Sequence, residues 1–238
     1  MKKICYHSLF LLFPGLLILC LFNAATSLAD ESPRSPLEIA KRLSERLGQL
    51  SSLSFNFTQQ TMDQISGRTK QASGHAYFVK DKDKTQMRWN YQAPDRQVII
   101  SDGKKLTMYF ENLNQMIIAP ADQLQQDVTY SFFTGTKDIE DEFFVSEGGQ
   151  IEEDSTDLPL YDVIRLEPRS TDSQVKDIRL WVKDLKQIQR IEIVDNFETK
   201  TIINISNIEE NSLTSAGKLT NTNLFSFAPP PGTEIIRQ

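Results

Sequence analysis

The chain has 238 residues, with 26 Lys and Arg against 32 Asp and Glu, which gives a formal net charge of −6. Lys and Arg supply most of the attraction to nucleic acids and to anionic lipid surfaces, so an acidic chain is a poor candidate for either partner. We therefore expect no nucleic-acid partner.

Residues 1–29 have the three parts of a secretory leader. Lys2 and Lys3 form a charged start, an apolar run covers 9–22, and 27–29 is a small-x-small cleavage site. The apolar run is shorter than the about 20 residues that span a bilayer, so we favour a cleaved leader over a retained membrane anchor.

Both cysteines, Cys5 and Cys20, lie inside this leader. The remainder, residues 30–238, therefore has no thiol for a disulfide, a nucleophile or a metal site. Its length suits one well-buried domain and is short for two. We predict a signal peptide over 1–29 and a single exported domain over 30–238.

The first element after the leader is a helix over 36–50. Its apolar residues recur every three or four positions, which places them on one stripe of a helix. They are Leu37, Ala40, Leu43, Leu47 and Leu50.

From residue 54 the apolar period changes to two, as in Phe55 and Phe57, which is typical of β-strands. Turns rich in Ser, Asp, Asn and Gly separate several successive segments. The predicted strands are 54–62, 70–80, 85–91, 96–101, 104–110, 114–119, 142–147, 160–168, 175–183, 187–195 and 198–206, with a last short strand near 224–228.

A second helix interrupts the strands over 121–134, where Leu124, Val128 and Phe132 recur every four residues. Short connections between the strands favour an antiparallel meander over a parallel α/β sheet. So many strands in one domain will curl. We predict a mainly β fold, an incomplete antiparallel β-barrel of about eleven strands covered by short helices.

Residues able to do chemistry are few. His75 is the only histidine after the leader, and no phosphate-binding loop, nucleophile elbow, zinc-protease or calcium-loop motif occurs. The acid pairs Asp138/Glu140 and Glu152/Asp154 leave a glycosidase as an alternative, although 32 acidic residues make chance pairs common. We expect no enzyme, no metal and no cofactor.

The strands instead carry apolar faces, which suit either an ordinary packed core or a cavity for a flexible apolar ligand. Periodicity alone does not separate these two interpretations. The residues predicted to line a lipid-binding cavity are Phe55, Phe57, Met87, Trp89, Tyr91, Leu106, Met108, Phe110, Met116 and Ile118.

Read in order, five stretches resemble the LolA family, the periplasmic carriers of outer-membrane lipoproteins. The stretches are Phe55-x-Phe57-Thr58-Gln59-Gln60, Gly74-x-x-x-Phe78-Val79-Lys80, Met87-Arg88-Trp89-Asn90-Tyr91 with Pro94, Ile99-Ile100-Ser101-Asp102-Gly103-Lys104-Lys105-Leu106 with Tyr109, and Phe225-Ser226-Phe227-x-Pro229-Pro230-Pro231-Gly232-Thr233. Singly they are weak patterns, and their order over almost the whole exported chain makes the resemblance specific.

The resemblance implies a periplasmic chaperone with a half-barrel, a helical lid and a cavity that shields lipoprotein acyl chains. It also implies two partners besides acylated lipoproteins, an inner-membrane ABC-type releasing transporter and an outer-membrane lipoprotein receptor. We expect a monomer. The lid residues expected to fill the empty cavity are Leu43, Leu47, Leu124 and Val128.

The chain departs from the family pattern at 80–86, which lacks the arginine-proline pair whose arginine holds the lid. Lys82, Lys84 and Arg88 are the candidates to replace it. The alternatives to a carrier are a LolA-like lipid-sensing or hydrophobic-ligand-binding envelope module, an exported hydrolase that uses His75 or an acid pair, and a structural envelope protein.

Overall fold

A computed structural model describes residues 34–81, 84–122, 132–133, 138–149, 161–213 and 224–238. Residues 34–238 group into one compact unit. Its described part contains a 12-stranded sheet in the order β12-β6-β5-β4-β3-β2-β1-β11-β10-β9-β8-β7. The strands are β1 (Ser52–Met62), β2 (Thr69–Asp81), β3 (Lys84–Ala93), β4 (Gln97–Ser101), β5 (Lys105–Phe110), β6 (Gln115–Pro120), β7 (Phe143–Glu147), β8 (Asp162–Pro168), β9 (Val175–Lys183), β10 (Gln187–Asp195), β11 (Lys200–Glu210) and β12 (Glu234–Arg237).

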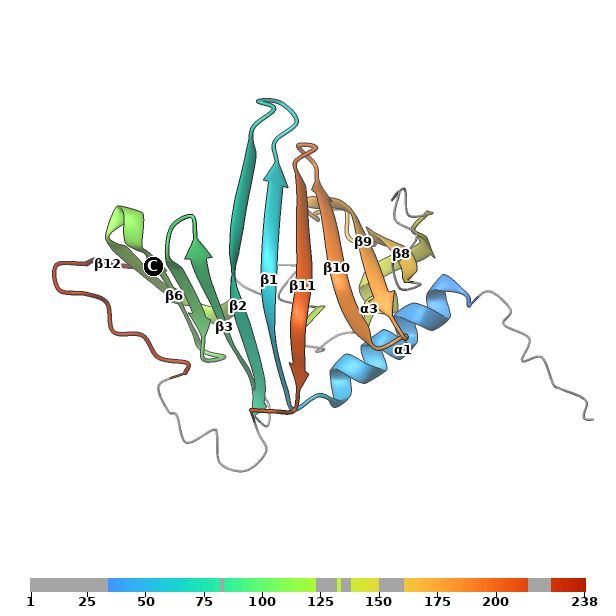
Figure 1. The fold of residues 1–238 in the computed structure, drawn as a ribbon, viewed down its shortest axis with the longest axis horizontal. Coiled ribbons are helices and arrows are strands. Elements are labelled where there is room, and N and C mark those ends of the chain that lie inside the picture. The colour runs from blue at the N-terminus through green and yellow to red at the C-terminus, as the bar shows by residue number, and fades with distance from the viewer. Residues whose placement is uncertain (1–33, 82–83, 123–131, 134–137, 150–160, 214–223) are drawn as a thin grey trace, which may run out of the picture. The chain divides into compact units, whose positions relative to one another are not determined.

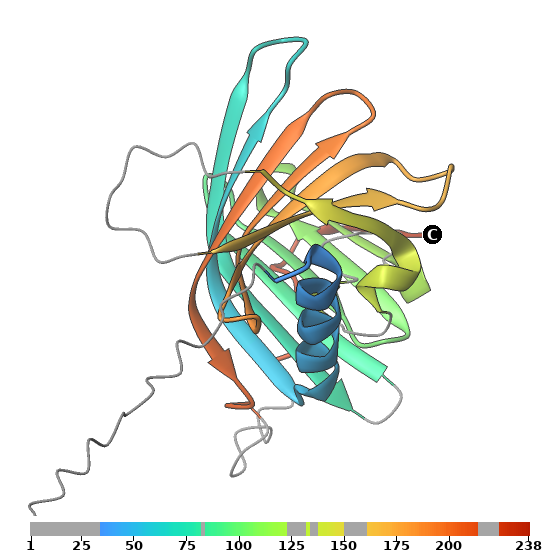
Figure 2. The ribbon, with the colours of Figure 1, turned by 90° about the vertical axis from the view of Figure 1, so that its right-hand side faces the viewer.

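Strand β1 joins the two halves of the sheet, because it pairs with β2 on one side and with β11 on the other. Phe57, for example, lies opposite both Gly74 and Ile205. The sheet ends at β12 and β7 and remains open, curling around helix α1 (Figures 1 and 2). This confirms the mainly β fold, an incomplete barrel with short helices.

The long strands from 54 to 206 form where the alternation predicted them, with ends that differ by a few residues. Two short elements were not predicted, the 3₁₀-helix η1 (Glu111–Leu113) and the helix α3 (Ile139–Glu142). Each is a single turn, too short for a helical period to show in the sequence.

The predicted strand near 224–228 is wrong. That stretch is irregular, and the last strand is β12, which pairs with β6 in parallel. The alternation of Phe225 and Phe227 arises because both rings pack on the outer face of the sheet, beside Tyr109 and Met116. The prolines at 229–231 have no N–H to donate to a strand ladder.

Helix α1 (Pro36–Gln49) begins where its sequence predicts. Ser35 caps it by accepting the N–H of Glu38 on its hydroxyl at 3.2 Å, and Pro36 occupies the first turn. The buried stripe faces α3, β7 and β8, and the opposite face is charged. Among the described helices, none combines the length and apolarity needed to cross a bilayer.

The predicted helix 121–134 lies mostly outside the described residues. Leu124 and Val128 belong to that part. Phe132 and Phe133 are described, are helical, and are both buried.

Gly74 is required by the close approach of β2 to β3. A Cβ placed there would lie 1.9 Å from the carbonyl oxygen of Asn90 and 3.0 Å from the ring of Phe57. We predict that Gly74→Ala lowers the free energy of unfolding by about 3 kcal/mol, because the strand backbones must move apart. Urea denaturation measures this loss.

Gly48→Ala is the matched control, because nothing lies within 4 Å of the added Cβ near the end of α1. This variant should be as stable as the parent chain or more stable, by up to about 1 kcal/mol. An unchanged stability of Gly74→Ala would contradict the observed register between β2 and β3.

Candidate functional site

Aromatic side chains line the inner, concave face at the centre of the sheet. Phe55 and Phe57 point inward from β1 because they alternate with polar residues along the strand. The ring centroid of Phe57 lies 4.7 Å from that of Trp89 and 5.0 Å from that of Tyr91, both in edge-on geometry. Such contacts are apolar and require no hydrogen-bond partner from a ligand.

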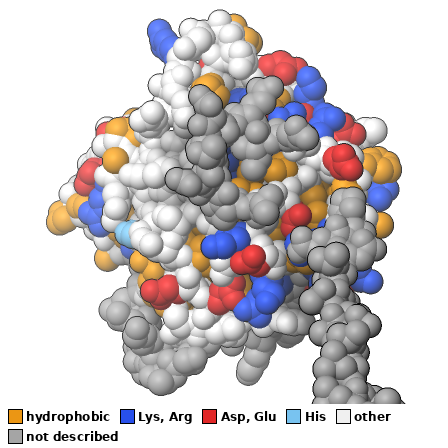
Figure 3. Space-filling view, turned by 45° about the vertical axis from the view of Figure 1, so that its right-hand side comes forward, with side chains coloured by type: hydrophobic (Ala, Val, Ile, Leu, Met, Phe, Trp, Pro, Cys, Tyr) orange, Lys and Arg blue, Asp and Glu red, His pale blue; other side chains and the backbone are white. Residues whose placement is uncertain are grey.

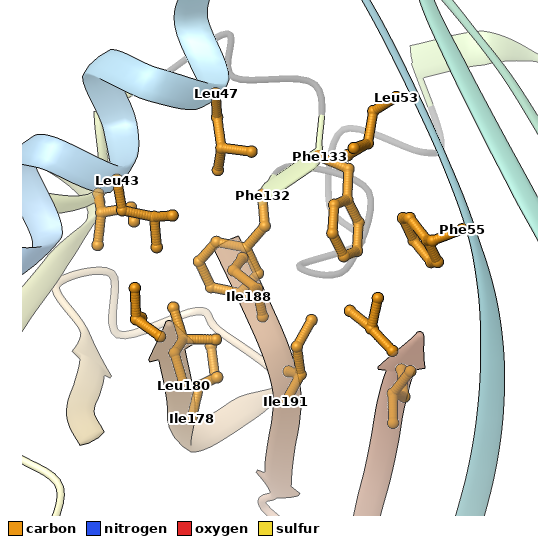
Figure 4. Packing of buried hydrophobic residues seen from close by; sticks show 14 of the residues in the cluster. Leu43, Leu47, Leu53, Phe55, Phe132, Phe133, Ile178, Leu180, Ile188 and Ile191 are labelled. Carbon is orange, nitrogen blue, oxygen red and sulfur yellow. The ribbon is translucent and has the colours of Figure 1, made fainter. Parts of the chain in front are cut away.

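Phe132 and Phe133 fill the space between this face and α1 (Figure 4). The ring centroid of Phe133 lies 4.8 Å from that of Phe55 and 5.2 Å from that of Phe78. Phe132 stacks near Phe143 of β7, with centroids 5.8 Å apart. The aromatic centre of the sheet is therefore covered by side chains of the chain itself.

Helix α1 covers the neighbouring part of the inner face. Leu43 and Leu47 point from α1 toward the β9 to β11 side of the sheet, with Leu43 fully buried (Figure 4). A buried hydrogen bond, from the N–H of Ile139 to the hydroxyl of Ser44 at 3.0 Å, joins α3 to α1.

Polar contacts hold the end of α1 against the sheet. The ammonium group of Lys80 donates to the carbonyl oxygens of Leu47 at 2.8 Å and Gly48 at 3.0 Å. Burial lowers the pKa of Lys80. Arg46 also forms an ion pair with Glu210 of β11. A cation at a helix C-terminus satisfies carbonyl groups that have no partner inside the helix.

A small apolar pocket opens beside this end of α1, with about 280 Å³ of free space that includes open solvent. Because part of that space is open solvent, the enclosed volume is far below the about 300 to 1,000 Å³ of ordinary ligand pockets, and it is too small for a set of acyl chains. Its lining is Leu47, Leu50, Leu53, Phe55, Phe133, Ile188, Ile205 and Ile208, with Lys186, Gln187 and Glu210.

The inner face is less covered toward the end of the sheet where the β1–β2 and β10–β11 hairpins turn. Tyr91, Val175 and Ile193 are only partly buried there, although they pack against the core. The interior is thus closed beside α1 and more open at the hairpin end.

Most of the predicted cavity residues come together on the inner face. Phe55, Phe57, Met87, Trp89 and Leu106 belong to one buried cluster. Tyr91 and Met108 pack against its margin.

Phe110 is half-buried and shares the inner side of β5 with Leu106 by strand alternation.

Met116 and Ile118 do not join them. The ladder places Met116 opposite Tyr109 and Ile118 opposite Thr107, which point to the outer face. There they pack with Val98, Ile100 and Tyr109 in a second cluster. The alternation of β6 was read correctly, but its sidedness requires the β5–β6 register, which the sequence does not contain.

The candidates for a lid-holding residue also separate. Arg88 lies on the outer face and donates to the carbonyl oxygens of Leu224 at 2.8 Å and Ser226 at 3.3 Å, so it holds the C-terminal segment. Lys84 is exposed, and Lys82 lies outside the described residues. Lys80, which was not predicted from the sequence, contacts the end of α1 instead.

Among the described residues considered for catalysis, Asp138 and Glu140 lie at the start of α3. His75 lies on β2 opposite Asn56 and Asn90, and Glu152 and Asp154 lie outside the described residues. Where the structure is described, His, Cys, Asp and Glu form no group of three or more able to hold a metal ion.

Several residues of the inner cluster were not predicted from the sequence, notably Phe78, Phe133 and Ile205. The period of two over 70–80 and 198–206 is the signal that finds Phe78 and Ile205. Phe133 has no such signal, because only its position against Phe55 identifies it.

We predict that Phe133→Ala lowers the free energy of unfolding by about 3 kcal/mol, since it removes a buried ring from between two others. The same variant should bind a fluorescent fatty acid more tightly, because the vacated space adjoins the pocket. Chemical denaturation and fluorescence titration measure the two effects.

Phe144→Ala is the control, because Phe144 is 55% exposed and its ring centroid lies 4.2 Å from the guanidinium carbon of Arg169. It should cost less than about 1 kcal/mol and leave fatty-acid binding unchanged. Equal effects of the two substitutions would contradict the role of Phe133 as a filler of the interior.

Comparison with known proteins agrees with this geometry. The outer-membrane lipoprotein carrier protein of Chromohalobacter salexigens is 27% identical over 199 residues, 84% of this chain and 87% of that protein. The protein of the same name from Methylococcus capsulatus is 29% identical over 210 residues, 88% of this chain and 90% of that protein.

Among solved structures, an uncharacterized conserved protein from Thermus thermophilus has the same fold, with a TM-score of 0.50 at 12% identity over 84% of this chain and 98% of that chain. The family model described as outer membrane lipoprotein carrier protein LolA matches residues 48–222. Because this match spans most of the sequence, the chain belongs to the LolA family of outer membrane lipoprotein carrier proteins.

Proposed function

We propose that this protein carries lipoproteins across the periplasm with their acyl chains enclosed between the curved sheet and its helical cover. The observation that carries the proposal is an apolar inner face covered by α1 and by Phe132 and Phe133. Neither cover is a strand of the sheet, so both can move while the sheet keeps its ladder.

Transfer free energies explain why such a carrier is needed. Each methylene group moved out of water contributes about 0.8 kcal/mol, so free acyl chains in the periplasm aggregate or return to a membrane. An interior walled by rings and aliphatic side chains removes this cost without directional bonds. Weak geometric demands also allow one carrier to accept different lipoproteins.

The proposed acyl site consists of residues on the inner face. Met116 and Ile118 are left out because they face the other side of the sheet. The site residues are Phe55, Phe57, Met87, Trp89, Tyr91, Leu106, Met108 and Phe110, with Phe133 as the side chain displaced by cargo.

Opening requires α1 to leave the sheet with Leu43 and Leu47. We assign Lys80 and the Arg46–Glu210 ion pair to holding the closed state, in place of the family's arginine. Leu124 and Val128 are proposed to move with the same cover.

The remaining assignments follow from this role. Residues 1–29 act as a cleaved signal peptide, and 30–238 act as one carrier domain without enzymatic activity. The carrier works as a monomer, receives cargo from an inner-membrane ABC-type transporter, and delivers it to an outer-membrane lipoprotein receptor.

Incubation with a detergent-released acylated lipoprotein tests the proposal. We expect a soluble one-to-one complex on size-exclusion chromatography after detergent removal, and none with the same lipoprotein lacking its acyl chains.

Trp89→Ala should weaken the complex about 10-fold or more, because it removes a large part of the apolar wall. Equal capture of the acylated and unacylated forms would refute an acyl-chain site.

Locking α1 to the sheet tests the opening step. Arg46→Cys combined with Glu210→Cys places thiols on two side chains that are in contact, and the exported chain has no other cysteine. A reducible bifunctional thiol reagent should abolish uptake of the lipoprotein, and reduction should restore it. The uncrosslinked double variant is the internal control, and uptake by the crosslinked form would show that α1 need not move.

A further inference from the structure

Two large apolar side chains stand exposed at the tips of neighbouring hairpins. Ile65, in the β1–β2 turn, is 84% exposed, and Phe197, in the β10–β11 turn, is 74% exposed. The hairpins are neighbours because β1 pairs with β11, where Met62 lies opposite Lys200. Both project at the same end of the sheet in two perpendicular views (Figures 1 and 2).

The two tips are built in the same way. Asp63 accepts the N–H of Ile65 at 2.9 Å, and Asp195 accepts the N–H of Phe197 at 2.8 Å, each through Oδ1. The same Oδ1 atom accepts a second backbone N–H in each turn, from Ser66 at 3.1 Å in the first and from Thr199 at 2.8 Å in the second. These bonds fix the turn and hold the apolar side chain outward.

Single exposed apolar residues are common on protein surfaces and need no explanation. Here the same arrangement occurs twice, on adjacent hairpins at one end of the sheet. Toward that end the inner-face residues Tyr91 and Ile193 are only partly buried. The tips therefore adjoin the more open side of the apolar interior.

Charge near the first tip favours a phospholipid surface although the whole chain is acidic. Arg68 and Lys70 follow Ile65, and Asp63 is engaged by N–H groups of its own turn. Hydrogen bonds from Ser66 and Ile65 hold the pKa of Asp63 below its ordinary value. In the space-filling view the uppermost end is mostly neither hydrophobic nor charged, with basic and hydrophobic side chains at its margins and acidic side chains just below (Figure 3).

We propose that the β1–β2 and β10–β11 tips form a membrane-contact edge, in which Ile65 and Phe197 insert into a phospholipid bilayer and Arg68 and Lys70 meet lipid phosphates. A fluid bilayer accepts two separate anchors directly, whereas a protein partner would need a matched hollow for each. Contact of this kind is reversible, because two inserted side chains bury far less apolar area than a membrane-spanning helix does. It brings the open end of the interior against the lipid.

Vesicle flotation tests the contact without any lipoprotein, so its result is independent of the carrier proposal. The full chain is expressed with its own leader, and the protein is recovered from the periplasmic fraction. Vesicles of phosphatidylethanolamine with a minority of phosphatidylglycerol serve as the probe. We expect the parent protein to float and the Ile65→Ser/Phe197→Ser variant to lose binding about 10-fold or more.

Leu37→Ser is the matched control, because Leu37 is 56% exposed on α1, away from the hairpins, and its loss should leave flotation unchanged. Arg68→Gln with Lys70→Gln should weaken binding and reduce its sensitivity to salt. Both sets of substitutions lie in exposed positions, so circular dichroism should show the parent fold.

The variant Phe197→Trp reports membrane insertion directly, because it places a fluorescent side chain at the second tip. Its emission should shift to the blue with vesicles and be quenched by brominated lipid, and Leu37→Trp should show neither change. Failure of the parent protein to float, equal flotation of the double serine variant, or an unshifted Phe197→Trp spectrum would each overturn the membrane-contact edge. The first of these results, with lipoprotein capture intact, would assign the tips to a protein partner.

Discussion

An open sheet has an apolar face with no second sheet to cover it, and this constraint governs the arrangement of the chain. In a sandwich the inner faces of two sheets bury each other. Here one sheet curls on itself, and the remaining gap is covered by α1 and by the rings of Phe132 and Phe133. Cover and sheet are separate elements, so the cover is replaceable by any apolar material of suitable volume. An acyl chain is such material, which links the fold to the proposed role.

On the outer face, the C-terminal segment covers the sheet near strand β6. Strand β6 would end the sheet with unpaired backbone groups, and such edges invite pairing with other chains. The C-terminal segment pairs β12 with β6, and on its way packs Phe227 on Tyr109, with ring centroids 4.9 Å apart. Arg88 holds the same segment through two carbonyl oxygens. The two faces therefore have different chemistry, a fixed outer cluster and an inner one whose cover can move.

The alternation of apolar residues was enough to predict β1 to β11 and the open, mainly antiparallel sheet, because strand side chains have a strict period of two. Alternation divides the side chains of a strand between the two faces of the sheet, but it does not indicate which face is the inner one. Phe55 and Trp89 were assigned together correctly because their strands are near neighbours, whereas Met116 was assigned to the wrong face. Lys80 could not be identified, since its role depends on α1 ending within reach of its ammonium group. Phe225 and Phe227 show the converse error, a period of two without a ladder.

The free energy that holds the cover on the sheet must be large enough to favour release of the cargo and small enough to let the cover open. If only the rings and leucines held the cover on the sheet, an acyl chain would bury the same apolar area that the cover buries. The closed and the loaded forms would then be equally stable, and loading would depend only on the concentration of the cargo. Polar contacts change this balance. Lys80, Arg46 and Ser44 bond partners in the closed state that an acyl chain does not supply, so each favours the empty form over the loaded one. Such contacts are worth about 1 to 3 kcal/mol each where they involve a charge, and less where water reaches them. Few contacts of this size bias the carrier toward release without preventing it from opening, which is the behaviour required of a protein that must both accept and give up its cargo.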